Sequence, residues 1–219
     1  MRLKKIQGAI LSSNIFILAN DTIQKMVIID LGMNGDHTNF KLKKELQEFR
    51  KNKEYEIEVF LTHCHLDHIL GYDNLTEYKD VQYSASPLTA KHINEKDAVT
   101  LLPMYGGEID FTVTKTYQDR EKIPFGEIDL EVIHAPGHTD GCAVIFEQKS
   151  KSLFSGDVVF ARGGCGRVDL PTGNRKVLND TLSKLAELEP SHLYSGHGPH
   201  MAFANVKENI LTAKRLLEW

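Results

Sequence analysis

The chain has 219 residues, of which 41% are hydrophobic, and this length and composition predict one sizeable core. We therefore expect a single domain spanning residues 1–219. The net charge of −4 argues against a general polyanion binder, so we expect no nucleic-acid partner. No apolar run approaches the roughly 20 residues that cross a bilayer, and the three cysteines have no disulfide-framework spacing. These features predict a cytoplasmic protein with no membrane partner.

Strand and helix patterns alternate along the chain. Short apolar runs predict strands at residues 3–6, 14–19, 26–30, 57–61, 81–84, 128–134, 142–148, 152–155 and 192–195. Apolar residues at helical spacing predict helices at residues 88–96, 174–188 and 204–217. The basic stretch 41–53 has Leu42, Leu46 and Phe49 at the same spacing, which indicates an amphipathic surface helix with a solvated basic face.

The strand predicted at residues 57–61 runs directly into His63, His65, Asp67 and His68. Alternation along an extended chain sends His63 and His65 to one side, and a following turn can bring Asp67 and His68 to a nearby position. Imidazole nitrogens and carboxylate oxygens suit catalytic Zn, Fe or Mn. A surface histidine cluster is the alternative, but this spacing after a buried strand favours a metal site.

Three further candidate ligands follow β-rich stretches later in the chain: His138, Asp157 and His197. Glycine or proline flanks each of them, which is typical of side chains presented from loops. Each is a weak signal by itself, because a histidine beside glycine is often only a loop residue. Together with the first four they would suffice for two metal ions about 3.5–4 Å apart.

The order of these motifs resembles that of the metallo-β-lactamase superfamily. The early strand at residues 26–30, which ends in Asp30 ahead of Gly32, belongs to the same pattern, and the resemblance covers nearly the whole chain. It implies an α/β protein with a four-layer αβ/βα sandwich, in which two mixed β-sheets are flanked by helices. It also implies that Asp30 braces the metal loop. The segment from Asp157 to Arg167 is similar to that of the glyoxalase II-like (hydroxyacylglutathione hydrolase) branch.

The resemblance implies a division of the ligands between two divalent ions, Zn in the first place with Fe or Mn as alternatives. Metal 1 is assigned to His63, His65 and His138, metal 2 to Asp67, His68 and His197, and Asp157 to the bridge between them. A carboxylate suits the bridge because each of its oxygens can face one cation. We expect Asp67 and Asp157 to be the catalytic residues.

A hydroxide bridging the two ions would attack a carbonyl carbon, with the oxyanion stabilised by metal. The glyoxalase II-like resemblance implies an acyl thioester substrate, such as S-lactoylglutathione or a related small thioester. It also places Arg167 as a cation that binds a substrate carboxylate. A local pair between Arg167 and Asp169 explains the same arginine equally well.

Other functions remain open. A persulfide dioxygenase would hold a single iron through His63, His138 and Asp157, as in two-histidine, one-carboxylate sites. A lactonase or esterase would use the same two metals, although Phe160 stands where such lactonases often carry a tyrosine. The sequence predicts no basic surface of the kind that an RNA-processing nuclease would need to bind RNA. A non-enzymatic scaffold or sensor would be expected to have lost a ligand, and here all seven are present. The sequence indicates no oligomeric state.

Overall fold

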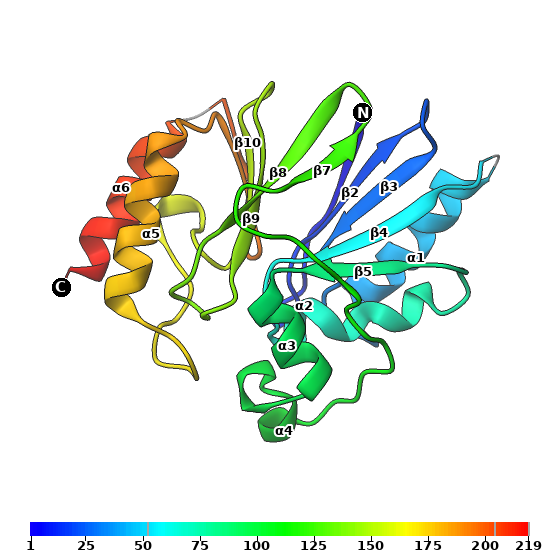
Figure 1. Cartoon of the computed structure of the whole chain (residues 1–219), viewed down its shortest axis with the longest axis horizontal. Helices are drawn as coiled ribbons and strands as arrows, with labels where there is room; N and C mark the ends of the chain where they lie inside the picture. Colours follow the sequence, from blue (N-terminus) through cyan, green and yellow to red (C-terminus); the bar gives the residue numbers. More distant parts are fainter. Residues whose placement is uncertain (52, 204, 219) are drawn as a thin grey trace.

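The computed structural model describes residues 1–51, 53–203 and 205–218 of the chain. Two mixed six-stranded sheets lie face to face, and helices cover their outer sides (Figure 1). This arrangement confirms the predicted four-layer α/β sandwich. Among the described residues, no helix combines the length and apolar character needed to cross a membrane.

The first sheet pairs its strands in chain order: β1 (Arg2–Ile6), β2 (Ile15–Asn20), β3 (Lys25–Ile29), β4 (Glu56–Leu61), β5 (Gln82–Ala85) and β6 (Lys115–Thr116). The pairs β1–β2 and β2–β3 are antiparallel, whereas β3, β4, β5 and β6 run parallel. Parallel strands end at the same edge of a sheet, so the loops after β3, β4 and β5 emerge together.

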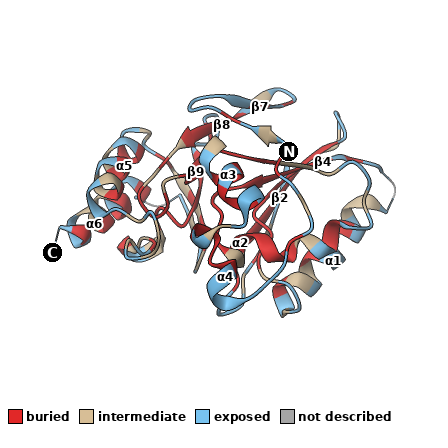
Figure 2. Cartoon of the chain, turned by 60° about the horizontal axis from the view of Figure 1, so that its bottom comes forward, coloured by how far each residue is buried: buried red, intermediate tan, exposed pale blue. Residues whose placement is uncertain are grey.

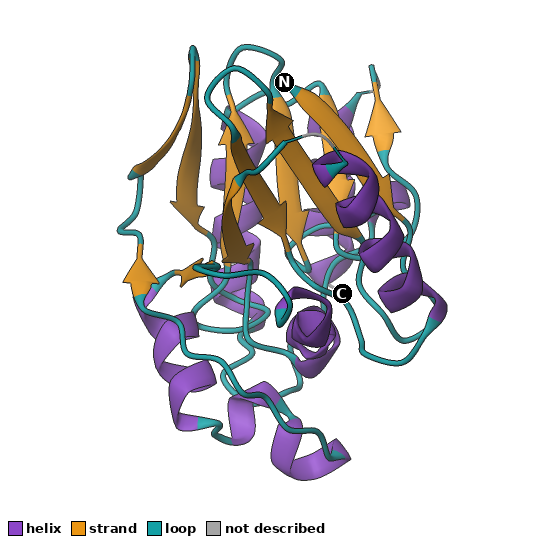
Figure 3. Ribbon diagram, turned by 90° about the vertical axis from the view of Figure 1, so that its right-hand side faces the viewer, coloured by secondary structure: helices purple, strands orange, loops and turns teal. Residues whose placement is uncertain are grey.

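The second sheet is also ordered along the chain: β7 (Lys122–Phe125), β8 (Ile128–His134), β9 (Ala143–Glu147), β10 (Ser152–Gly156), β11 (His192–Ser195) and β12 (Met201–Ala202). Only its β10–β11 pair is parallel among the described strands. The loops after β10 and β11 therefore leave this sheet on the same side. Figure 3 shows long loops and short helices beyond one end of the strands.

Strand β2 illustrates why the sheets pack on both faces. Its side chains alternate, so Ile15 and Ile17 join the core under the helices, whereas Phe16 and Leu18 join the core between the sheets. Phe154 of the second sheet meets Phe16 edge to face, with ring centroids 5.4 Å apart. Full burial of side chains of this size stabilises the fold by roughly 1.5–3 kcal/mol each.

Helices α1 (His37–Arg50) and α3 (Pro87–Glu95) pack on the first sheet, and α5 (Arg175–Glu187) and α6 (Val206–Leu217) on the second. Figure 2 shows buried residues along the inner sides of these helices. The other described helical segments are short: α2 (Leu66–Ile69), α4 (Leu102–Tyr105), η1 (Leu70–Leu75), η2 (Ala98–Thr100) and η3 (Ala161–Gly163). The carboxylate of Asp36 and the side-chain carbonyl of Asn174 cap α1 and α5 by accepting backbone N–H bonds.

The strands and helices predicted from periodicity are confirmed to within a few residues at their ends. The helix predicted at 41–53 begins earlier, at His37, because Asp36 caps it, and residue 52 lies outside the described residues. Residue 204, predicted to begin the last helix, also lies outside them. Strand β7 was not predicted: Pro124 argues against a central strand, but β7 is an edge strand, where proline is tolerated.

Candidate metal centre

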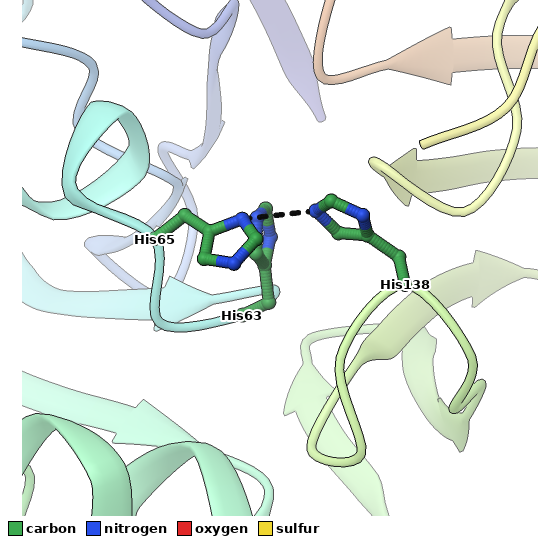
Figure 4. A group of neighbouring side chains, drawn as sticks. All are labelled: His63, His65 and His138. Atoms are coloured by element: carbon green, nitrogen blue, oxygen red, sulfur yellow. Dashed lines mark hydrogen bonds between the residues drawn. The ribbon is translucent and has the colours of Figure 1, made fainter. Parts of the chain in front are cut away.

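The predicted ligands lie where strand-end loops of the two sheets meet. Strand β4 delivers His63 and His65, and the short helix α2 carries Asp67 and His68. From the second sheet, β10 leads to Asp157 and β11 leads to His197, while His138 lies in the loop between β8 and β9. Figure 4 shows His138 approaching from the opposite side to His63 and His65.

The structure brings all seven predicted ligands into three overlapping groups. The groups are His63, His65 and His138; His63, His68 and Asp157; and Asp67, His68 and His197. In each group, one nitrogen or oxygen per residue lies within 4.8 Å of the corresponding atom of the others. The first and third groups contain the same residues as the two predicted metal sites.

Asp157 lies between the histidines of the two predicted sites. Its Oδ1 is 3.3 Å from Nε2 of His68, and its Oδ2 is 3.5 Å from Nε2 of His197. The same Oδ2 is 3.8 Å from Nε2 of His138, which belongs to the other group. A carboxylate in this position can contribute an oxygen to a metal ion in either group.

Asp30 holds the far side of the cluster. Its Oδ1 accepts a hydrogen bond from the backbone N–H of Thr62 at 2.9 Å, and its Oδ2 accepts one from the Thr62 hydroxyl at 2.9 Å. Nδ1 of His68 lies 2.8 Å from the same Oδ2. Asp30 has a φ of 58°, an uncommon left-handed conformation that the surrounding contacts must maintain. The brace implied by the family resemblance is therefore present.

The histidines also have their outer nitrogens engaged. Nδ1 of His138 lies 2.7 Å from the backbone carbonyl oxygen of Arg167, and Nδ1 of His63 lies 3.2 Å from Oγ1 of Thr62. A histidine that donates from Nδ1 keeps a lone pair on Nε2. Figure 4 marks the result: Nε2 of His138 faces Nδ1 of His65 at 3.0 Å.

Metal ions fit the atoms left free by these contacts. Nε2 of His63, Nε2 of His68 and Oδ1 of Asp157 are buried and have no hydrogen-bond partner among the described residues. Each buried polar atom left unpaired costs about 1–3 kcal/mol, so their convergence calls for a ligand. Nitrogen and carboxylate donors suit a divalent transition metal, and the cluster is able to bind such ions without selecting Zn or Fe.

The pKa values of His63 and His65 keep these two imidazoles neutral and able to bind a cation. Burial, reinforced by neighbouring imidazoles, lowers the pKa of His63 well below its ordinary value and that of His65 to about 3. Burial would raise the pKa of Asp157, but the positive charge of His68, whose Nε2 lies 3.3 Å from Oδ1, outweighs it and holds that pKa below its ordinary value. Burial would lower the pKa values of His68 and His197, but the carboxylates beside them outweigh it and hold both above the ordinary value. The site thus presents the neutral imidazoles of His63 and His65 beside a cluster of histidines paired with carboxylates.

A family model described as "Metallo-beta-lactamase superfamily" matches residues 9–197, a range that includes every predicted ligand. The chain belongs to the metallo-β-lactamase superfamily. A probable metallo-hydrolase, MJ0888 of Methanocaldococcus jannaschii, is 32% identical to this superfamily member over 93% of the chain and 97% of its own length. The protein is therefore a metallo-hydrolase of this superfamily.

Two further relatives are informative. Hydroxyacylglutathione hydrolase of Bdellovibrio bacteriovorus is 32% identical over 82% of this chain and 60% of its own length. TTHA1623, solved in a di-iron-bound form, is 26% identical with a TM-score of 0.71, over 91% of this chain and 94% of that chain. Both are superfamily relatives of this metallo-hydrolase.

A cavity of about 690 Å³ opens over the metal cluster of this metallo-β-lactamase-like protein, a volume typical of small-molecule sites. Arg167 and Cys165 both line it. The Arg167 guanidinium donates two hydrogen bonds to Asp169, from Nε at 2.9 Å and from Nη2 at 2.8 Å. Arg167 therefore lines the cavity, and its guanidinium forms the local ion pair with Asp169 that was the alternative to binding a substrate carboxylate.

Sequence reasoning missed Asn14, which ties two ligand loops together. This buried side chain donates from Nδ2 to the carbonyl oxygens of Ser195 at 2.8 Å and Gly198 at 3.0 Å, on both sides of His197. Its neighbour Ser13 donates its backbone N–H to the carbonyl oxygen of Asp67 at 3.1 Å. Only the position of Asn14 at the start of a predicted strand hinted at a role, because no ligand chemistry marks it.

Proposed function

We propose that this metallo-hydrolase cleaves an acyl thioester, such as S-lactoylglutathione or a related small thioester, using two divalent metal ions. The observation that carries the two-metal proposal is the position of Asp157 between the histidine groups, with Oδ1 3.3 Å from His68 and Oδ2 3.8 Å from His138. The di-iron-bound TTHA1623 supports two ions, and the hydroxyacylglutathione hydrolase relative supports a thioester.

His63, His65 and His138 would hold one ion, and Asp67, His68 and His197 the other, with Asp157 shared. Bound there, the ions would supply an acidified water and polarise the substrate carbonyl. The chain itself contributes three features to the reaction. Asp157 offsets the positive charge, Asp30 and the Arg167 carbonyl orient the rings of His68 and His138, and the cavity gives the substrate access to the cluster.

Asp67 is suited to orient the attacking water. Its side chain is 24% exposed and borders the cavity, and its Oδ2 lies 3.1 Å from Nε2 of His197. Burial alone would raise the pKa of Asp67, but the charges of His68 and His197 outweigh it and keep that pKa below its ordinary value. An ionised carboxylate at the edge of the cavity can accept the proton of a water molecule approaching from solvent.

The first experiment is elemental analysis of the purified protein, combined with thioester hydrolysis and oxygen-uptake assays. We expect about two metal ions per chain and cleavage of S-lactoylglutathione or a short acyl thioester without oxygen uptake. One iron per chain, with oxygen consumed in the presence of glutathione persulfide, would overturn the proposal in favour of a persulfide dioxygenase. Two ions with cleavage of lactones alone would overturn it in favour of a lactonase.

Two variants sharpen this test. Asp157→Asn removes the charge that faces both histidine groups, so we expect the second ion to be lost and kcat/KM to fall at least 100-fold. Asp129→Asn is the matched control, since it removes an exposed carboxylate that pairs with Lys122 at 3.2 Å and does not line the cavity over the metal cluster. It should retain both ions and full activity.

A further inference from the structure

The mouth of the cavity over the metal cluster is apolar. Ile10 and Leu11, in the loop after β1, line it although their side chains are 98% and 75% exposed. Tyr105 lines it from α4 and is 66% exposed. Large hydrophobic residues this exposed carry an unfavourable hydration free energy, which a ligand that covers them would remove.

The wall continues inward with apolar groups. Leu66, Leu101, Phe160 and Leu170 also line the cavity and are less exposed than the residues of its mouth. Cys165 completes this wall, and burial raises the pKa of its thiol, so that it stays protonated and behaves as a small hydrophobic group. The Phe160 ring meets the His197 ring edge to face, at 5.8 Å between centroids, so the apolar wall reaches the metal cluster itself.

Charge is nearly absent from these walls. Apart from the candidate metal ligands, the one charged side chain among the described residues lining the cavity is Arg167. Its guanidinium fork is already filled by the carboxylate of Asp169, at 2.9 and 2.8 Å. Both side chains are about two-thirds exposed. An incoming ligand would therefore meet the two opposite charges together, and their net electrostatic attraction for it would be small.

From these walls we infer that the substrate is a thioester with an apolar acyl chain on a small uncharged thiol carrier, rather than a thioester of glutathione. This inference rests on the proposed thioester hydrolysis and narrows its substrate. Glutathione carries two carboxylates and an ammonium group, and specific binding of these requires charged partners that the cavity walls do not offer. An acyl chain instead gains from each methylene it buries against the walls.

The test compares carriers at a fixed acyl group and acyl groups on a fixed carrier. On protein that carries its metal ions, kcat/KM is measured for acetyl, butyryl and hexanoyl thioesters of N-acetylcysteamine and of glutathione. We expect the uncharged carrier to be preferred at least tenfold. We also expect kcat/KM to rise about three- to fourfold per added methylene until the cavity is filled.

A binding measurement gives a readout that does not depend on turnover. Calorimetry with two thioethers that cannot be hydrolysed, S-hexyl-N-acetylcysteamine and S-hexylglutathione, should show tighter binding of the uncharged compound. Leu11→Ser should flatten the dependence on acyl length. Leu216→Ser is the matched control, because Leu216 is a similarly exposed leucine, at 61%, on α6 and does not line the cavity.

The Arg167–Asp169 pair provides a gain-of-function arm. Asp169→Asn would release the guanidinium toward the cavity, so we expect kcat/KM for the glutathione thioester to rise severalfold, with a smaller change for the uncharged carrier. Adding Arg167→Ala to this variant should abolish the gain. These responses would show that Asp169 normally cancels the one cation that could attract an anionic carrier.

The outcomes separate this inference from the proposed function. A tenfold preference for the glutathione thioester, or no dependence on acyl length, would overturn the inference and leave thioester hydrolysis standing. A dimer in sedimentation that Leu11→Ser dissociates would also overturn it, because the apolar mouth would then be covered by a second copy of the chain. Cleavage of neither thioester series by the metal-loaded protein would overturn the proposed function itself.

Discussion

Nδ1 of His68 lies 2.8 Å from Oδ2 of Asp30, and both side chains are almost completely buried, at 0% and 2% exposure. Asp30 directly follows β3 and His68 belongs to α2, so this contact joins two segments that leave the same edge of the first sheet. A carboxylate that accepts the Nδ1 proton fixes the histidine tautomer. The same contact orients the ring so that Nε2 faces Asp157.

Asp30→Asn tests this relationship. The substitution keeps the shape of the side chain but removes its charge, and the new amide can no longer accept from His68 and Thr62 at full strength. We expect the affinity for the ion held by Asp67, His68 and His197 to fall about 10–100-fold, with the other ion less affected. Competition with a chromophoric chelator measures both affinities, with Asp129→Asn as the control. Unchanged affinities in Asp30→Asn would contradict the role given to Asp30.

Gly166 lies against the ring of His138. A Cβ at this position would come within 2.6 Å of Nδ1 of that ring and nearer still to the carbonyl oxygen of Asp157, which is closer than real side chains approach. Gly166→Ala should therefore displace His138 from the Arg167 carbonyl, reduce the metal content toward one ion per chain and lower kcat/KM at least tenfold. Elemental analysis and steady-state kinetics measure both effects.

Gly164→Ala is the control for that substitution, two residues away in the same loop. Its added Cβ would find its nearest neighbours, atoms of Phe160, at 3.4 Å, an ordinary van der Waals contact. We expect this variant to keep its metal ions and activity. Equal losses in both variants would mean that the loop tolerates no side chain anywhere, and that contact with His138 is not the reason.

The sequence predicted the ligand set because ligand chemistry is a property of side-chain type. His138 could be found in this way, but the group that orients it could not, since it is the backbone carbonyl of Arg167. Asn14 escaped for a related reason: its hydrogen bonds go to carbonyl oxygens more than 180 residues later in the chain. Periodicity predicted most strands but not β7, which contains Pro124. Proline is tolerated there because β7 is an edge strand, and the position of a strand in its sheet cannot be read from local sequence.

Asn14→Asp tests the link between the ligand loops. The substitution replaces an N–H donor by an oxygen that would face the carbonyl oxygens of Ser195 and Gly198. We expect the free energy of unfolding of the metal-free protein to fall by about 1–3 kcal/mol, and the ion bound by His197 to be held more weakly. Urea denaturation and chelator competition give the two values. Asn179→Asp is the control, because Asn179 makes only long contacts, at 3.4 and 3.5 Å, near the surface.

Glu58 is a buried acid in the first sheet, remote from the metal cluster. Its carboxylate accepts a hydrogen bond from the Tyr117 hydroxyl at 2.7 Å and pairs with Lys115 at 3.2 Å and Lys25 at 3.3 Å. Burial would raise the pKa of Glu58. The Tyr117 hydrogen bond and the two lysine charges outweigh burial and hold that pKa below its ordinary value of 4.5.

A carboxylate whose pKa is lowered by folding stabilises the fold above its unfolded-state pKa, and this contribution disappears as the pH falls through the folded-state value. Glu58→Gln should therefore lower the free energy of unfolding by roughly 1–3 kcal/mol near pH 7, because Lys25 would lose its buried charge partner and keep only the exposed Glu56 at 3.9 Å. The difference from the unmodified chain should shrink as the pH is lowered below about 4.5. Urea denaturation of the metal-free proteins between about pH 7.5 and pH 3.5 measures it. A difference that stays constant across this range would mean that the charge of Glu58 does not contribute, and that its hydrogen bond to Tyr117 alone matters.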